Sequence, residues 1–155
     1  MNIIFVCYGN ICRSTMAEFM MKHYVKKRGL EELYHIESAG TSRENLGDDT
    51  YYRAQQTLRE HNIPYQKRRA RQINQQDYEF FDYILCMDDN NLYTLKYMFN
   101  GDSFKKCHKI MSFSGSADDV ADPWYTRNFE KTFEDLELGI NAFLDKMEES
   151  GAHKN

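Results

Sequence analysis

The sequence has no uninterrupted apolar stretch of the roughly 18 residues that a membrane-spanning helix needs. It also has no excess of basic residues, since its formal net charge is -4 at pH 7, whereas nucleic-acid-binding surfaces are normally basic. The N-terminus lacks the basic flank and the long apolar segment of a secretory signal peptide. We therefore expect a cytoplasmic protein that binds neither a membrane nor a nucleic acid.

Linkers, internal repeats and low-complexity segments are also absent from the sequence, which contains only 2 prolines in 155 residues. A chain of this length normally forms one domain with a substantial buried core. We predict a single domain over residues 1–149. The short polar tail at residues 150–155 is predicted to be disordered.

Four cysteines are present, and the cytoplasm keeps cysteines as thiols unless they have a redox or catalytic role. Cys86 and Cys107 fall at the end of one predicted strand and the start of another, so we interpret both as structural. Cys7 and Cys12 lie together in the segment VCYGNICRS, which also contains a glycine, an asparagine and an arginine. A disulfide, a metal site, an ordinary loop and a catalytic loop are all compatible with that segment taken alone.

Apolar runs and helical periodicity alternate along the chain, and this alternation predicts an α/β fold. Thr15 and Glu18 predict a capping box that starts the first helix. Strands separated by helices predict a parallel sheet that is covered by helices on both faces, with functional residues at the carboxyl ends of its strands. The predicted strands are 2–7, 33–41, 81–88 and 107–113, and the predicted helices begin at residue 15 and span 48–62, 89–99 and 129–147.

Cys7 and Arg13 enclose five residues between the first predicted strand and the first predicted helix. If this loop curls around its centre, its backbone N–H groups and the positive end of the helix form a phosphate-binding loop. Arg13 carries a planar guanidinium that can bind two phosphate oxygens at once. The same positive field favours a thiolate, so Cys7 is predicted to be a nucleophile below the bound phosphorus.

Neighbouring residues fit the same interpretation. Gly9 permits a close backbone approach, and Asn10 is among the few residues that tolerate a left-handed conformation. Ser14 can form a hydrogen bond with the Cys7 sulfur. Each residue alone has an ordinary structural explanation, so the catalytic interpretation depends on their combination between a strand and a helix.

A thiolate that attacks phosphorus must expel an oxygen leaving group, and a positioned general acid makes that departure easier. Asp122 in the segment ADPWY is the best candidate for this acid, because Pro123 stiffens a loop that follows the fourth predicted strand. Asp-Pro is also a common turn. Trp124 and Tyr125 are either a core anchor or the aromatic wall of an entrance.

These segments resemble the low-molecular-weight protein tyrosine phosphatase family over nearly the whole chain. IIFVCYGNICRSTMAE resembles the catalytic loop of the family, ESAGT the end of its second strand, ARQI and FDYILCMDDNN its middle, and DPWY the segment that carries its general acid. The resemblance implies a four-stranded parallel sheet in a three-layer domain, and hydrolysis of phosphotyrosine without a metal or other cofactor. It implies that Cys7 forms a phosphocysteine and that Asp122 acts first as the acid and then as the base.

The resemblance also assigns supporting roles. Arg13 binds the phosphoryl group, Ser14 assists the departing sulfur, and Asn10 and Ser38 hold the loop in shape. A reversible disulfide between Cys7 and Cys12 is implied as protection against irreversible oxidation. The residues expected to contact the substrate are Tyr8, Gly9, Asn10, Ile11, Cys12, Arg13, Ser14, Trp124 and Tyr125.

The implied partners are phosphotyrosine proteins, together with phosphate, vanadate or similar oxyanions in the loop. The sequence does not fix the oligomeric state, and a monomer is favoured.

Three positions depart from the family pattern: Tyr8 replaces an aliphatic residue, Thr15 replaces a proline, and Arg68 stands where some relatives carry a histidine that supports the loop. No tryptophan occurs near residues 45–47, and the basic run 67–71 is interpreted as a solvated face.

Rival functions of the same fold are less compatible with the sequence. Arsenate reductases need further cysteines close to the site, whereas Cys86 and Cys107 lie on two separate predicted strands. Protein arginine phosphatases typically carry threonine at the position of Ile11. A non-catalytic phosphate-binding or redox-sensing protein would need neither the nucleophile Cys7 nor the acid Asp122.

Overall fold

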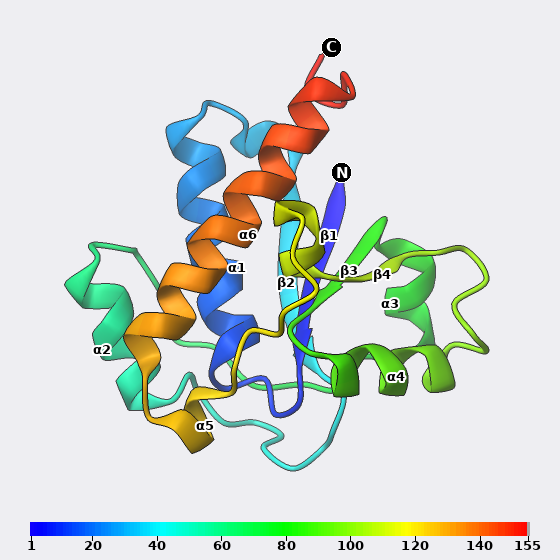
Figure 1. The fold of residues 1–155 in the computed structure, drawn as a ribbon. Coiled ribbons are helices and arrows are strands. Elements are labelled where there is room, and N and C mark those ends of the chain that lie inside the picture. Colours follow the sequence, from blue (N-terminus) through cyan, green and yellow to red (C-terminus); the bar gives the residue numbers. More distant parts are fainter. Residues whose placement is uncertain (155) are drawn as a thin grey trace.

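A parallel sheet of four strands forms the centre of the computed structural model, which describes residues 1–154 (Figure 1). The strands are β1 (Asn2–Cys7), β2 (His35–Gly40), β3 (Tyr83–Cys86) and β4 (Cys107–Lys109), and their order in the sheet is β2-β1-β3-β4. All three pairings are parallel. The prediction of an α/β fold with a four-stranded parallel sheet is therefore confirmed.

Alternate residues of β1 enter two different hydrophobic clusters, which shows why the sequence of this strand is continuously apolar. Ile3 and Phe5 pack with α1 (Arg13–Lys27) and α6 (Phe129–Glu149). Ile4 and Val6 pack on the opposite face, with side chains of α3 (Gln75–Phe80) and α4 (Asp89–Met98). Figure 1 shows these helices on the two sides of the sheet, so the domain has three layers. A strand buried on both faces needs apolar residues at every position.

Three shorter helical segments complete the fold. Helix α2 (Tyr52–Glu60) packs against α1 and α6, and the four-residue helix α5 (Pro123–Thr126) directly precedes α6. The 3₁₀ segments are η1 (Glu31–Leu33) and η2 (Ile110–Ser114). Within residues 1–154 no helix is both long enough and apolar enough to span a membrane.

The capping box predicted for the first helix is wrong. Helix α1 begins at Arg13, and its N-terminal cap has no side-chain hydrogen bond. The Thr15 hydroxyl instead contacts the hydroxyl of Thr50 at 2.7 Å, and Glu18 accepts a hydrogen bond from Ser38 at 2.6 Å. The loop after β1 runs directly into the helix, so these side chains are used for tertiary contacts.

The fourth strand is shorter than predicted, because the chain turns into η2 after Lys109. Ile110 and Met111 are buried against α6, where Gly139 leaves room for them: a Cβ atom at that glycine would lie 3.0 Å from Ile110. These two residues therefore pack on a helix and do not extend the sheet. The sequence analysis also missed α3 and α5, both of six residues or fewer.

The segment after α6 coincides with the predicted tail. Residues 150–153 form a turn, in which the Ala152 N–H donates to the Met147 carbonyl at 3.0 Å. Tyr34 and His153 form a side-chain hydrogen bond. Asn155, the last residue of the predicted tail, lies outside the described residues.

Candidate active site

The loop between β1 and α1 lies at the carboxyl end of the sheet, as expected for a functional site in a parallel α/β fold. It forms one side of an open pocket of about 150 Å³. The loop residues that line this pocket are Cys7, Tyr8, Gly9, Ile11, Cys12 and Arg13. Glu44 and Asn45 from a second loop, and Asp122, Trp124 and Tyr125 from a third, complete the lining.

Cys7 is the last residue of β1, and only 3% of its surface is exposed. Its sulfur accepts a hydrogen bond from the backbone N–H of Asn10 at 3.3 Å and lies 3.0 Å from the Ser14 hydroxyl. Among residues 1–154, no acceptor is present for the N–H groups of Gly9, Ile11 or Cys12. Unpaired amides in a curled loop at a helix N-terminus form an environment that suits an anion.

Asn10 holds the loop in its curled shape. Its backbone φ is 60°, a left-handed conformation that asparagine tolerates. Its side-chain amide donates to Ser14 at 2.8 Å and to Ser38 at 3.0 Å, and Ser38 donates in turn to Glu18. Because the Ser14 oxygen already accepts this bond, its hydroxyl hydrogen is free to point at the Cys7 sulfur.

Asn10 and Ser14 are fully buried behind the loop and do not line the pocket. The carbonyl oxygen of the Asn10 side chain accepts hydrogen bonds from the Arg68 guanidinium and from the Arg71 N–H. Burial lowers the pKa of Arg68, against the opposing charges of Glu18 and Asp49. The interpretation of residues 67–71 as a solvated face is therefore wrong for Arg68, whose guanidinium holds the loop in place. Arg71 binds the loop through its backbone alone, and its guanidinium, 35% exposed, pairs with Asp77 and Glu37.

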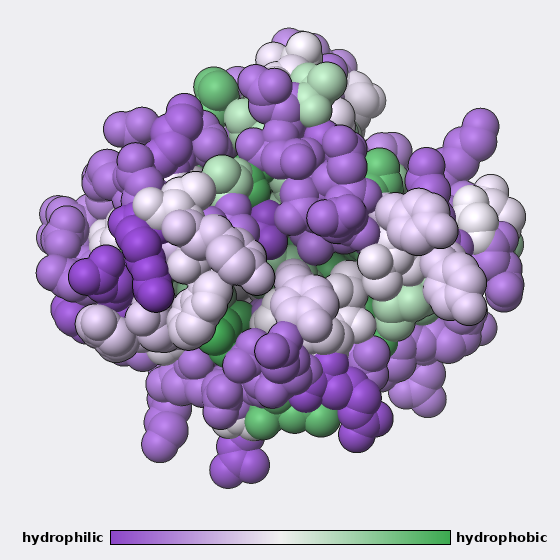
Figure 2. Space-filling model, turned by 60° about the horizontal axis from the view of Figure 1, so that its bottom comes forward, coloured by the Kyte–Doolittle hydropathy of each residue, from purple (hydrophilic) through white to green (hydrophobic). Residues whose placement is uncertain are grey.

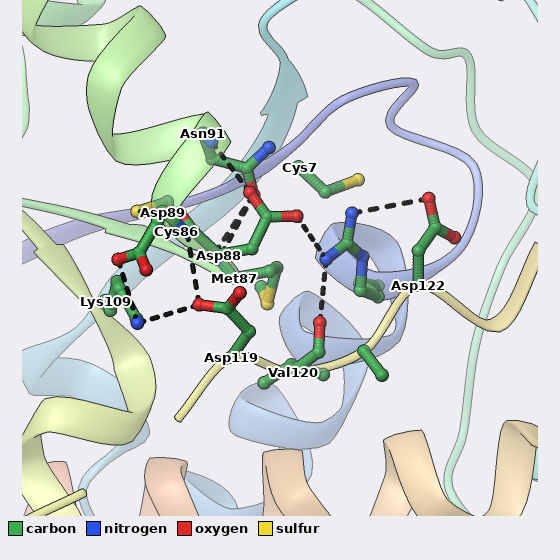
Figure 3. A network of polar contacts seen from close by, with 12 residues as sticks. Cys7, Cys86, Met87, Asp88, Asp89, Asn91, Lys109, Asp119, Val120 and Asp122 are labelled. Carbon is green, nitrogen blue, oxygen red and sulfur yellow. Dashed lines mark hydrogen bonds and ion pairs between the residues drawn. The ribbon is translucent and has the colours of Figure 1, made fainter. Parts of the chain in front are cut away.

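Arg13 is the first residue of α1 and is 97% buried. Its Nη1 donates to Asp88 and to the Val120 carbonyl, both at 2.8 Å, and its Nη2 lies 3.5 Å from Asp122 (Figure 3). Burial alone would lower the pKa of Arg13, but the charges of Cys7, Asp88 and Asp122 outweigh it and raise that pKa. The guanidinium is thus a fixed positive charge that faces the pocket.

Asp122 is the N-terminal cap of α5, where Oδ1 accepts a hydrogen bond from the Trp124 N–H at 3.0 Å. Pro123 occupies the first turn of that helix and fixes the backbone direction. The Asp122 side chain is 30% exposed and lines the pocket together with Cys7. The sequence analysis placed Asp122 on the correct side of the sheet, but it did not predict the capping geometry.

Aromatic side chains surround the mouth of the pocket. Tyr8 is 52% exposed and Tyr125 is 82% exposed, while Trp124 packs edge-on against Tyr51 at a centroid distance of 5.1 Å. Figure 2 shows pale side chains of intermediate hydropathy gathered on this face of the molecule, among strongly hydrophilic ones. Of the two roles considered for Trp124 and Tyr125, the wall of an entrance agrees with their position.

Several site residues were missed by the sequence analysis. Glu44 and Asn45 line the pocket, and Gly9 leaves room for the latter, since a Cβ atom at Gly9 would lie 2.5 Å from its side-chain nitrogen. Asp88, which holds Arg13, also caps α4 in a capping box with Asn91. The signal available for Asp88 was its position two residues after β3, at the carboxyl end of the sheet.

The four cysteines are free thiols. Burial, and then the charge of Cys7, raises the pKa of Cys12, which shares the pocket with Cys7. Burial also raises the pKa of Cys107, to about 12, and that of Cys86, and neither of these residues lines the pocket. The disulfide between Cys7 and Cys12 stays a prediction.

Comparisons with known proteins find relatives over nearly the whole chain. The family model for low molecular weight phosphotyrosine protein phosphatase matches residues 2–153. The chain is 34% identical to the low molecular weight protein-tyrosine-phosphatase YfkJ of Bacillus subtilis, over 92% of this chain and 93% of that protein. It is 36% identical to the human low molecular weight phosphotyrosine protein phosphatase, over 94% of each chain.

Solved structures are also similar to this chain over most of its length. The crystal structure of YfkJ from Bacillus subtilis superposes with a TM-score of 0.92 and 33% identity, covering 97% of this chain and 96% of the other. The structure of a Drosophila arginine phosphatase is also similar, with a TM-score of 0.87, 32% identity, and coverage of 94% and 97%.

Proposed function

The chain belongs to the low molecular weight phosphotyrosine protein phosphatase family, and from that premise we propose that it hydrolyses phosphotyrosine through a covalent intermediate on Cys7. Small aryl phosphates are substrates of the same reaction. The observation that carries the proposal is the convergence of a thiol, a guanidinium and a carboxyl group, from Cys7, Arg13 and Asp122, on a single pocket. A protein that only bound phosphate would need neither the thiol nor the carboxyl group.

In the first step the Cys7 thiolate attacks phosphorus, so that a sulfur–phosphorus bond forms and the bond from phosphorus to the tyrosine oxygen breaks. Asp122 in its acid form gives its proton to the departing oxygen, which leaves as a neutral phenol. Arg13 and the loop amides bind the phosphoryl oxygens as the charge on them changes. Asp88 and the Val120 carbonyl hold the guanidinium in place throughout.

In the second step the Asp122 carboxylate accepts a proton from water, and the water oxygen attacks phosphorus while the phosphorus–sulfur bond breaks. The products are inorganic phosphate and the Cys7 thiolate. The Ser14 hydroxyl, 3.0 Å from the sulfur, stabilises that thiolate as it departs. Apart from the substrate and this water molecule, both steps use only groups of this chain.

The first prediction tests the nucleophile. We expect the reduced protein to hydrolyse p-nitrophenyl phosphate, with vanadate as an inhibitor and EDTA without effect. Cys7→Ser should lower kcat by about a thousandfold or more, since a serine hydroxyl is a poor nucleophile here. Cys107→Ser is the matched control, because that buried thiol lies away from the pocket. Equal activity of wild type and Cys7→Ser would refute the proposal.

Phosphoarginine is the alternative substrate, because a Drosophila arginine phosphatase is among the similar structures. Ile11, which lines the pocket, is an aliphatic residue where arginine phosphatases typically carry threonine. We therefore favour the aromatic substrate. Comparing kcat/KM for two peptides that differ only in phosphotyrosine or phosphoarginine decides between them, and a preference for phosphoarginine would reverse the assignment.

A further inference from the structure

Lys109 is a nearly buried cation that the proposed reaction does not use. It is the last residue of β4, and only 9% of its side chain is exposed. Its Nζ contacts Asp119 at 2.7 Å, the Ala117 carbonyl at 2.6 Å and Asp89 at 3.0 Å. All three of its donor hydrogens therefore have acceptors.

Two of these contacts lie on residues 117–122, which we call the acid loop because it ends at Asp122. Asp119 also accepts a hydrogen bond from the Asp89 N–H, at the start of α4, at 3.1 Å. Figure 3 shows Lys109 between Asp89 and Asp119, so the lysine joins the acid loop to the helix. Removing this cation would take away the ion pair that joins Asp119 of the acid loop to Asp89 of the helix, and would leave only the hydrogen bond from the Asp89 N–H.

The next residue of the acid loop connects this cluster to the reacting groups. Val120 is fully buried, and its N–H donates to the Met87 carbonyl at 2.8 Å. Its own carbonyl accepts the hydrogen bond from Arg13 at 2.8 Å. Asp122 follows two residues after Val120. A shift of the backbone at Asp119 would therefore move both the carbonyl that binds Arg13 and the carboxyl group of Asp122.

We propose that Lys109 is a positioning residue for the general acid, acting through Asp119 and Val120 to fix where Asp122 stands. This inference rests on the proposed phosphatase function. Lys109 does not line the pocket, so it acts on the acid loop and not on the substrate. Displacement of a catalytic group by about 1 Å can lower a rate about a hundredfold.

The test measures kcat/KM for a series of aryl phosphates whose phenols differ in acidity, because kcat/KM includes the step in which the phenol departs. A strongly acidic phenol leaves without a proton, whereas a weakly acidic one needs the acid. Lys109→Met should therefore lower kcat/KM about tenfold for weakly acidic phenols and little for strongly acidic ones. The Asp122→Ala variant supplies the reference for a complete loss of the acid.

Asp119→Asn should give the same pattern from the other side of the contact, and the double variant should be no worse than either single one. Asp119 is 44% exposed, so this substitution tests the proposal even if Lys109→Met does not fold. Arg28→Met is the matched control, since Arg28 forms an ion pair with Asp145 in the C-terminal half of α6, away from the acid loop. Its leaving-group dependence should equal that of wild type.

A second measurement reports on the acid loop and does not depend on enzymatic turnover. Trp124 is the only tryptophan and lies two residues after Asp122, so its fluorescence reports on this segment. Acrylamide should quench it more strongly in Lys109→Met than in Arg28→Met. A uniform loss of kcat/KM across all phenols, or unchanged kinetics and quenching, would overturn the positioning role. Wild-type protein inactive on every aryl phosphate would instead refute the phosphatase function itself.

Discussion

A single asparagine joins four parts of the active site. Asn10 adopts φ 60°, and its side chain bonds to Ser14, Ser38, Arg68 and the Arg71 N–H. The loop therefore depends on one residue both for its backbone conformation and for its attachment to the surrounding elements. An alanine would lose both contributions at once.

Asn10→Ala is expected to lower the free energy of unfolding by about 5 kcal/mol, at about 1 kcal/mol for each of the four side-chain hydrogen bonds and a similar amount for the left-handed backbone. Urea denaturation measures this change. Asn62→Ala is the matched control, because Asn62 also has positive φ, 58°, but is exposed. It should cost only about 1 kcal/mol. Equal losses in the two variants would show that the side-chain bonds of Asn10 contribute little.

At the rim of the pocket, the carboxylate of Glu44 interacts with the Tyr8 hydroxyl. A hydrogen bond and the negative charge from Glu44 raise the pKa of Tyr8. Glu44 is exposed and lines the pocket beside a substrate phosphate that is itself negative. A carboxylate there should repel acidic side chains that flank the phosphotyrosine.

We predict that phosphotyrosine peptides with flanking lysines have a higher kcat/KM than peptides with flanking glutamates. Glu44→Gln should reduce that ratio by about threefold, the usual size of an exposed charge interaction, and salt should reduce it in wild type as well. Glu149→Gln, at the far end of α6, should leave the ratio unchanged. If Glu44→Gln also leaves it unchanged, the rim charge does not select substrates.

Among the structural elements, α4 has a function beyond packing, because its capping box orients a site residue. Asp88 accepts from the Asn91 N–H at 2.7 Å, and Asn91 accepts from the Asp88 N–H at 3.3 Å. The same Asp88 carboxylate binds Arg13. The start of this helix therefore fixes the direction of the phosphate-binding guanidinium.

Asn91→Ala is expected to lower the free energy of unfolding by about 1 kcal/mol, the usual contribution of a cap, and also to lower kcat/KM by several fold. Asn74→Ala removes the equivalent cap of α3, which lies on the same face of the sheet but does not contact Arg13. It should cost the same stability and leave kcat/KM unchanged. Equal kcat/KM values in Asn91→Ala and Asn74→Ala would show that the cap of α4 does not contribute to the function of Arg13.

Long, regular elements of this fold could be predicted from the sequence, whereas short helices and contacts between separate segments could not. Strand β1 and helix α6 were found because their apolar patterns are long and regular, and Cys7 and Arg13 because the loop between strand and helix has a fixed spacing. Helix α3 was missed because it has only six residues, although its capping pair Asn74 and Asp77 was a usable signal. The contact of Arg68 with Asn10 could not be predicted, because the two residues are 58 positions apart in the sequence. The contacts of Lys109 could not be predicted, because they depend on how the end of β4, the start of α4 and the segment around Asp119 meet in space.

At the scale of the whole molecule, the phosphate-binding loop connects most of the fold. It continues β1 into α1, it bonds to the end of β2 through Asn10, and Arg13 links it to α4 and to the acid loop. An oxyanion that binds this loop therefore binds only the folded chain. Such a ligand must stabilise the whole domain by mass action.

Phosphate at about ten times its dissociation constant should add about 1.4 kcal/mol to the free energy of unfolding. For a domain of this size that corresponds to a rise in Tm of about 3–6 °C. Thermal unfolding in phosphate, compared with chloride at equal ionic strength, measures the effect without any turnover. Arg13→Met should abolish the rise, whereas Arg28→Met should retain it, because Arg28 pairs with Asp145 on α6, away from the pocket. A rise that persists in Arg13→Met would place the oxyanion outside this loop.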